Sequence, residues 1–201
     1  MRQSSFKTID LTFGAIFVVL MMIGANIVYW IPALKITYAG GEVPLTLQTF
    51  FAILAGLLLG KKLGAFSMIV YIAIGICGVP VFSEMKSGPM QLLLPTGGFL
   101  LSFILVAYVA GLVVEKFNKE SLYVYITGAA IGLMINYGIG TPFMYFSLNY
   151  VVELPVKFTV AILMMVPFFI KDLVITMAIA VIMPKFITRL QKASLPVGLK
   201  R

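Results

Sequence analysis

Long apolar segments, each about as long as a bilayer-spanning helix, follow one another along almost the whole of this chain. Of its 201 residues, 61% are hydrophobic and 11% are charged, and the mean hydropathy is +1.08. A helix needs roughly 20 apolar residues to cross about 30 Å of hydrocarbon, so this length allows about six such helices and little else. The sequence therefore predicts an all-α, polytopic membrane protein with six transmembrane helices and a single domain over residues 1–201.

Prolines, glycines and charged turns mark the ends of the six expected helices. The predicted ranges are about 8–30, 44–60, 63–79, 97–114, 122–148 and 158–190. The last range is long for one span, and Pro167 is expected to divide it into a short helix and a longer sixth helix, because proline lacks a backbone N–H. The first apolar run, from Ile9 to Ile31, exceeds the apolar core of a signal peptide, so we expect it to remain as a helix.

The net charge of +8 points to membrane orientation because of where the basic residues lie. Lysine and arginine concentrate at both termini and in the turns at 61–62 and 116–119, whereas the opposite loops hold only Lys35, Lys86 and Lys157. By the positive-inside rule, both termini are expected in the cytoplasm and the loops after the first, third and fifth helices outside. We expect no nucleic-acid partner.

Two adjacent charges, Lys171 and Asp172, stand inside an otherwise apolar stretch from Val166 to Met183. An ionisable group at membrane depth costs at least about 2.5 kcal/mol by insertion scales, so such groups usually face a cavity, a partner or a ligand. Pro167 suits the first turn of a helix, which predicts that the pair lies near an outward-facing helix mouth. In the alternative interpretation, the two charges only neutralise each other and orient the helix.

Further polar residues are predicted to gather on the same outer face. They are Thr46, Gln48 and Thr49 before and in the second helix, the long third loop, and Asn136 with Tyr137 in the fifth helix. Buried amides and carboxylates must be hydrogen-bonded, so this group predicts either mutual pairing or a polar ligand in a pocket near the extracellular face. For Asn136, a bond to a neighbouring helix is as plausible as ligand contact.

Several familiar chemistries find no support in the residues. The chain has no histidine and one cysteine, Cys77, which excludes an internal disulfide and offers no metal cluster. Gly56 to Lys61 resembles a Walker sequence, but three rather than four residues separate its glycines, and Lys62 stands where serine or threonine is required. Gly56 and Gly60 instead predict a close helix crossing. We expect no cofactor and no enzymatic activity; a membrane enzyme using Asp172 as acid or base is the distant alternative.

Several strings resemble the BioY family, the biotin-specific S components (substrate-binding subunits) of energy-coupling factor (ECF) transporters. The resemblance covers nearly the whole chain and is carried by Val43–Phe50, Leu54–Gly60, Gly78–Phe82, Pro95–Leu101, and Pro167-Phe168 with Asp172. It implies high-affinity binding and uptake of extracellular biotin by a multi-pass protein of the bacterial cell membrane. It also implies three partners in the bilayer and cytosol: a transmembrane coupling subunit and two cytosolic ATPases.

The resemblance assigns roles to the candidate residues. Asp172 is expected to accept hydrogen bonds from the ureido nitrogens of biotin and Lys171 to pair with its carboxylate. Gln48, Asn136 and Tyr137 are candidate polar contacts, and Phe82 is expected to cover the ring system. Many family members have a lysine three residues after the matching aspartate, where this chain has Ile175, and a glycine-rich third loop, where this chain has 83–89. An S component for another vitamin is the near alternative.

Overall fold

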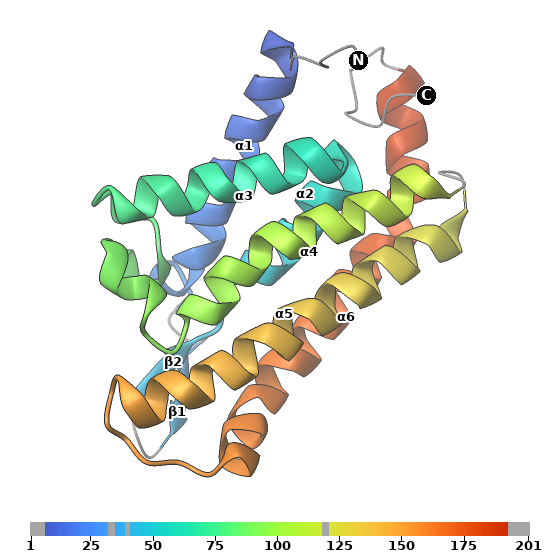
Figure 1. The fold of residues 1–201 in the computed structure, drawn as a ribbon. Helices are drawn as coiled ribbons and strands as arrows, with labels where there is room; N and C mark the ends of the chain where they lie inside the picture. Colours follow the sequence, from blue (N-terminus) through green and yellow to red (C-terminus); the bar gives the residue numbers. More distant parts are fainter. Residues whose placement is uncertain (1–6, 32–34, 39–40, 118–120, 193–201) are drawn as a thin grey trace.

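The computed structural model describes residues 7–31, 35–38, 41–117 and 121–192 of the chain. Six α-helices make up most of this part (Figure 1), which confirms the all-α prediction. They are α1 (Thr8–Ala25), α2 (Gln48–Leu59), α3 (Lys61–Ile76), α4 (Gly97–Lys116), α5 (Leu122–Tyr150) and α6 (Phe158–Lys192). Four of them, α1, α4, α5 and α6, are long and apolar enough to cross a membrane, whereas α2 has only 12 residues.

The connection between α1 and α2 contains structure that the sequence did not predict. After a short 3₁₀ helix, η1 (Ile27–Tyr29), the strands β1 (Lys35–Tyr38) and β2 (Gly41–Pro44) form an antiparallel hairpin in which Lys35 lies opposite Pro44. Pro44 was expected to open the second helix, but it ends β2, and α2 begins only at Gln48. The third loop contains two more 3₁₀ helices, η3 (Ser83–Met85) and η4 (Pro89–Leu92).

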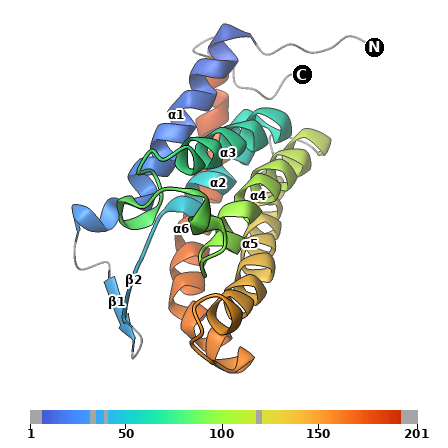
Figure 2. The same cartoon turned by 60° about the vertical axis from the view of Figure 1, so that its left-hand side comes forward.

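The helices pack around one large apolar core, and a smaller apolar cluster of Met144, Leu148 and Ala161 lies between α5 and α6. α4 packs against α2, α3 and α5, α6 lies along α5, and α1 covers α2 and α3 (Figure 2). Each of the six helices contributes at least one fully buried side chain to the large core: Met21, Ile53, Met68, Val106, Leu133 and Met183. The short helix α2 therefore lies inside the bundle and is held by its neighbours.

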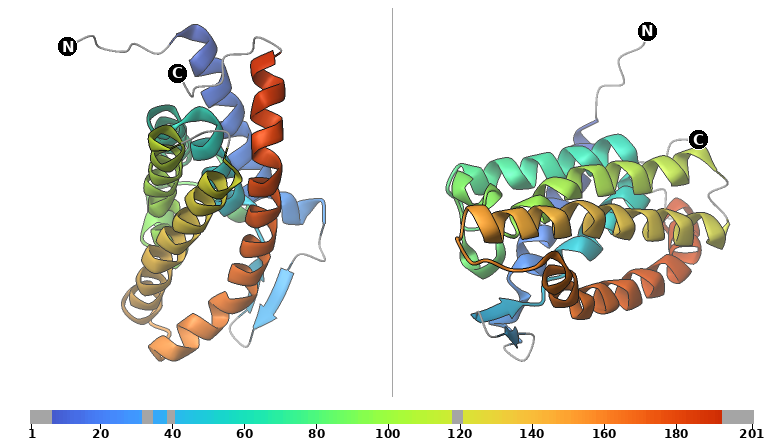
Figure 3. Two further views of the ribbon diagram at one scale, coloured as in Figure 1. Left: turned by 90° about the vertical axis from the view of Figure 1, so that its right-hand side faces the viewer. Right: turned by 60° about the horizontal axis from the view of Figure 1, so that its bottom comes forward.

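The described loops alternate between the two ends of the bundle, as expected of successive spans. α1 begins and α6 ends beside the α2–α3 turn and the end of α4, while the β-hairpin, η3 and residues 151–157 lie at the opposite end (Figures 1 and 3). We call the second end the hairpin end. At the first end, Glu115 of α4 fixes the α2–α3 turn: its Oε1 accepts a 2.8 Å hydrogen bond from the backbone N–H of Lys61, and its Oε2 lies 3.1 Å from Lys61 Nζ.

The sixth helix was expected to be interrupted at Pro167, and this prediction is wrong. α6 continues from Phe158 to Lys192 with both Pro167 and Pro184 inside it. Its ribbon changes direction between the orange and the red part (Figure 3), in keeping with the bend that proline causes when it removes one backbone hydrogen bond. Asp172 is 14 residues after Phe158, so about 21 Å of helix at 1.5 Å per residue separates it from the start of α6, and the charged pair does not lie at a helix mouth.

The predicted close helix crossing at Gly56 is present. A Cβ atom built on Gly56 would lie 2.3 Å from the backbone oxygen of Ala107 in α4, so no larger residue fits without moving one of the two helices. Small residues at such crossings let the backbones approach closely, which strengthens van der Waals packing where no hydrophobic driving force acts between helices in lipid. This crossing sets the position of α2 against α4.

Candidate functional site

The residues Thr46–Thr49, which we call the α2 start segment, connect α2 to four other helices. The Thr46 carbonyl accepts a hydrogen bond from Lys171 Nζ of α6, and Leu47 N donates one to Gly24 O of α1 at 2.8 Å. Gln48 Nε2 donates to the Tyr71 hydroxyl of α3 at 2.9 Å. Thr49 Oγ1 accepts from Asn136 Nδ2 of α5 at 3.1 Å. Since α2 itself is short and buried, this segment joins the polar groups of the bundle at its hairpin end.

The charged cluster consists of Lys171, Asp172 and Tyr137. Asp172 is 2% exposed, and its Oδ2 accepts a 2.7 Å hydrogen bond from the Tyr137 hydroxyl. Its Oδ1 lies 2.7 Å from Lys171 Nζ in an ion pair and accepts no hydrogen bond from the residues that the structure describes. A buried carboxylate needs such partners, because the desolvation of an unpaired charge is very costly.

Aromatic rings enclose the Tyr137 side of this cluster. The Tyr137 ring makes edge-to-face contacts with Phe99 of α4 and Phe169 of α6, with centroid distances of 5.7 and 5.1 Å. Such pairs add to the stabilisation from area burial alone. Phe99 and Phe169 thus pack against the ring whose hydroxyl donates to Asp172.

Gln48 begins a second polar chain that leads into the third loop. Its Nε2 donates to the Tyr71 hydroxyl, which in turn donates to the backbone oxygen of Val81 at 2.9 Å. The ring of Phe82, 2% exposed, packs edge-on against Tyr71 with 5.7 Å between centroids. Gln48 and Phe82 are therefore linked through Tyr71, and the start of the third loop is fixed against α2 and α3.

Asn136 lies at the centre of a third polar group, between α2, α4 and α5. It is fully buried, and its Oδ1 accepts a 2.7 Å hydrogen bond from the Ser102 hydroxyl while its Nδ2 donates to Thr49 Oγ1. Ser102 Oγ also approaches the Phe99 carbonyl at 2.8 Å. Both polar ends of the Asn136 amide thus have protein partners, as the helix-pairing interpretation of this residue requires.

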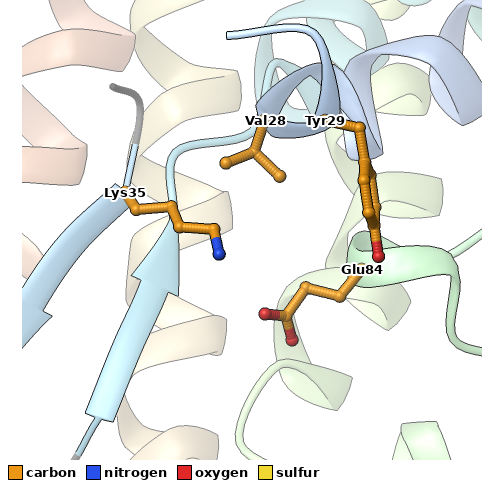
Figure 4. Close-up of a pocket in the computed structure, with 4 residues that line it drawn as sticks. All are labelled: Val28, Tyr29, Lys35 and Glu84. Atoms are coloured by element: carbon orange, nitrogen blue, oxygen red, sulfur yellow. The ribbon is translucent and has the colours of Figure 1, made fainter. Parts of the chain in front are cut away.

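A small pocket of about 170 Å³ lies at the hairpin end, outside these three groups. Val28, Tyr29, Lys35 and Glu84 line it, and Figure 4 shows the Lys35 ammonium and the Glu84 carboxylate directed toward the space between β1 and η3. The Glu84 carboxylate also pairs with Lys86 at 2.6 Å. None of the residues predicted to bind a ligand is among these four.

The six predicted site residues thus fall into three groups that meet at the α2 start segment. Asp172 contacts both Lys171 and Tyr137. Gln48 with Phe82, and Asn136, are joined to this cluster through the α2 start segment. Sequence reasoning missed Tyr71 and Ser102, whose signal was a hydroxyl within a mostly apolar run. It also missed Thr176, which is fully buried one turn after Asp172.

The charge environment of the described part of the chain is simple. Within residues 7–31, 35–38, 41–117 and 121–192, no group of three or more histidine, cysteine, aspartate or glutamate residues is placed to hold a metal ion. Asp172 is the acidic residue buried in the bundle there, and Lys171 its cationic neighbour. The arrangement offers one carboxylate acceptor, one ammonium donor and several amide and hydroxyl groups, which suits recognition of a ligand with polar groups at separate ends.

Comparisons with known proteins agree over almost the full length. The profile of the BioY family matches residues 1–192. BioYB of Bacillus subtilis is 35% identical over 194 residues, which cover 96% of this chain and 95% of that protein. The biotin transporter BioY of Thermotoga maritima is 41% identical over 140 residues, covering 70% and 74% of the two chains. A crystal structure of the S-component for biotin from an ECF-type ABC transporter shares this fold, with a TM-score of 0.63 and 22% identity over 94% of this chain and 95% of that one.

Proposed function

Because this chain belongs to the BioY family, we propose that it binds extracellular biotin with high affinity as the substrate-specific S component of an ECF-type, ATP-driven vitamin importer. The names of relatives such as that from Thermotoga maritima, and the S-component fold, support this proposal. The family is one of transporters, so the chain is not an enzyme. We propose Asp172 as a binding group rather than an acid or base.

The observation that carries the proposal is the buried Asp172 carboxylate, with Tyr137 on one oxygen and Lys171 beside the other. Biotin has a ureido ring with two N–H donors and a valerate carboxylate at its far end. A carboxylate accepts N–H donors, so Asp172 suits the ureido nitrogens, and an ammonium has three donors, so Lys171 suits the ligand's carboxylate. Lys171 reaches toward the hairpin end, where it meets the Thr46 carbonyl.

The other candidate residues play supporting parts in this proposal. Tyr137 orients the Asp172 carboxylate and presents the edge of its own ring to biotin. Phe82, in the third loop, covers the ring system of biotin. Gln48 and Asn136 already have protein partners, so each contacts the ligand only by exchanging one of these bonds. We therefore propose Asp172, Lys171 and Tyr137 as the primary contacts and Gln48, Asn136 and Phe82 as secondary ones.

The proposed orientation places the hairpin end outside a bacterial cell membrane and both termini in the cytoplasm. It is supported by the basic residues at the opposite end, such as Lys62, Lys116 and Arg189, because positively charged loops remain on the cytoplasmic side. The described apolar side chains on the outer surface of α1, α4, α5 and α6 then face lipid or partner subunits.

Transport requires partners in this proposal, since the chain binds the vitamin but has no nucleotide motif of its own. A transmembrane coupling subunit and two cytosolic ATPases supply the energy. The surface of α1 with Ile16 and Val19, 47% and 51% exposed, is the proposed docking face for the coupling subunit. An alanine-xxx-alanine face on the first helix is common among S components, whereas in this chain Val19 follows Ala15 after four positions.

The first experiment is equilibrium binding of biotin to the purified, detergent-solubilised chain, with thiamine and riboflavin as competitors. We expect tight, saturable binding that neither competitor displaces. Folded protein that binds one of the competitors instead would make the chain an S component for another vitamin. Folded protein that binds none of the three would overturn the proposal.

A further inference from the structure

Three hydroxyl groups inside the helices of this chain bond to the carbonyl one turn earlier, and other helix hydroxyls, such as that of Ser147, bond to a neighbouring segment. Thr12 Oγ1 donates to Thr8 O at 3.1 Å, Ser67 Oγ to Leu63 O at 2.9 Å, and Thr188 Oγ1 to Pro184 O at 2.9 Å. This local bond satisfies a hydroxyl that has no other partner. Thr176 in α6 has neither kind of bond: within the described part of the chain its hydroxyl has no hydrogen-bond partner, although the residue is fully buried.

Thr176 follows Asp172 by one helical turn, so the two side chains lie on the same face of α6. Asp172 Oδ1 is the other buried oxygen on this helix that has no hydrogen bond within the described residues. Two successive turns of α6 therefore present oxygen atoms with unused hydrogen-bonding capacity. A buried hydroxyl without a partner costs about 1–3 kcal/mol by mutational data, which folding alone gives no reason to accept.

We propose that the Thr176 hydroxyl is a ligand-contacting group that donates to the ureido carbonyl oxygen of biotin, one turn deeper in the bundle than Asp172. This inference rests on the proposed function. An ionised carboxylate only accepts hydrogen bonds, so Asp172 pairs with the ureido N–H groups and leaves the ureido oxygen without a donor. A threonine hydroxyl supplies that donor, and its position on the same helix face places it beside the same ring.

The order of groups along α6 fits a ligand of this kind. Going inward from the hairpin end, α6 presents a cation at Lys171, an acceptor at Asp172 and a hydroxyl donor at Thr176. Lys171 also donates a hydrogen bond to the Thr46 carbonyl of the α2 start segment. A ligand with an anionic tail and a ring that carries both N–H and C=O groups matches that order when its tail points toward the hairpin end. Thr176 then determines specificity for the ring carbonyl.

The test compares Thr176→Val, which keeps the shape and removes the hydroxyl, with Thr176→Ser, which keeps the hydroxyl. Binding to the purified full chain is measured with biotin and with 2-thiobiotin, whose sulfur is a weak acceptor in place of the ureido oxygen. We expect Thr176→Val to weaken biotin binding at least fivefold and 2-thiobiotin binding less than twofold, and Thr176→Ser to recover most of the biotin affinity. Thr188→Val, which removes a hydroxyl with a local partner on an exposed position, serves as the control.

Two outcomes overturn the inference while leaving the proposed function intact. One is wild-type protein that binds biotin and a Thr176→Val variant that binds it equally well. The other is an equal loss for biotin and 2-thiobiotin, because that result indicates a change in the shape of the site and not a lost bond to the ring oxygen. If the wild-type chain binds no biotin, the proposed function fails first. The ligand-free melting temperature of Thr176→Val is expected to match or exceed that of the wild type, since the removed hydroxyl has no hydrogen-bond partner among the described residues.

Discussion

The Lys171 ammonium lies 2.7 Å from Oδ1 of its sequence neighbour Asp172, although adjacent side chains on a helix start about 100° apart. The long, flexible side chain of Lys171 can bend so that its ammonium reaches the neighbouring carboxylate despite this separation. The same ammonium also donates a hydrogen bond to the Thr46 carbonyl. The pair is therefore a point of attachment between α6 and the start of α2 as well as a source of ligand-binding groups. The structural and functional interpretations of these two charges are compatible.

Removing the cation alone is expected to destabilise the protein strongly. Lys171→Met leaves the Asp172 carboxylate buried without its charge partner, which typically costs about 3–5 kcal/mol of the free energy of unfolding. The double variant Lys171→Met/Asp172→Leu removes both charges and is expected to unfold closer to the wild type. Thermal unfolding in detergent, followed by circular dichroism, measures both. The 2.7 Å contact indicates that the two charges stabilise each other in the folded protein. A double variant less stable than Lys171→Met would contradict this coupling.

Asp172→Asn is expected to weaken biotin binding at least about tenfold, or more than about 1.4 kcal/mol, while the protein stays folded. The amide keeps the shape of the carboxylate but loses its charge and replaces one acceptor with a donor. Equilibrium binding and the elution profile on size exclusion check affinity and folding together. Unchanged affinity in the folded variant would remove Asp172 from the ligand contacts.

The Tyr137 hydroxyl is expected to act through Asp172. Tyr137→Phe keeps the ring between Phe99 and Phe169 and removes the 2.7 Å hydrogen bond to Oδ2. A hydrogen bond to a charged group contributes about 1.5–3 kcal/mol, so we expect biotin affinity to fall by about tenfold or more through loss of carboxylate positioning. In an Asp172→Asn background the same change should have a much smaller effect. Equal effects in both backgrounds would mean that Tyr137 acts independently of Asp172.

The sequence was sufficient to predict those parts of the molecule that depend on a residue's own chemistry. Uninterrupted apolar runs located all six helices, and a charge in such a run singled out Lys171 and Asp172, because both signals come from the cost of transfer into lipid. Tyr137 was found because it lies beside a second polar residue, Asn136, in an apolar helix. The candidate cluster was thus predictable, although its ligand role stays a prediction.

What could not be predicted depends on contacts between distant segments. α6 passes through Pro167 because neighbouring groups in a helical bundle tolerate the lost hydrogen bond, which no local rule reveals. The hairpin strands have four residues each, too short for a clear alternating pattern, and Pro44 looked like a helix start. Gln48 and Tyr71 are 23 positions apart in the sequence, and Tyr71 and Val81 are 10 positions apart. The hydrogen bonds that link these three residues therefore become visible only in the folded chain.

Ser102 distinguishes the two interpretations of Asn136. Ser102→Ala leaves the buried Asn136 Oδ1 without its 2.7 Å donor, so we expect a stability loss of about 1–3 kcal/mol. If Asn136 serves only to join α2, α4 and α5, the biotin affinity of the folded variant stays within about twofold of the wild type, a difference of less than about 0.5 kcal/mol. A larger drop in affinity would indicate that the Asn136 amide turns toward the ligand. Binding titrations and melting temperatures of the same preparation separate these results.

Cys77 provides a direct test of membrane orientation. It is the chain's single cysteine, it is exposed, and it directly follows the last residue of α3, at the hairpin end. With that end outside, a membrane-impermeant maleimide should label Cys77 in intact cells. Tyr123, 79% exposed near the start of α5, lies at the other end, so Tyr123→Cys in a Cys77→Ser background should be labelled only after the cells are opened. The reverse pattern would place the termini outside the cell and remove the extracellular access that the proposed uptake of biotin requires.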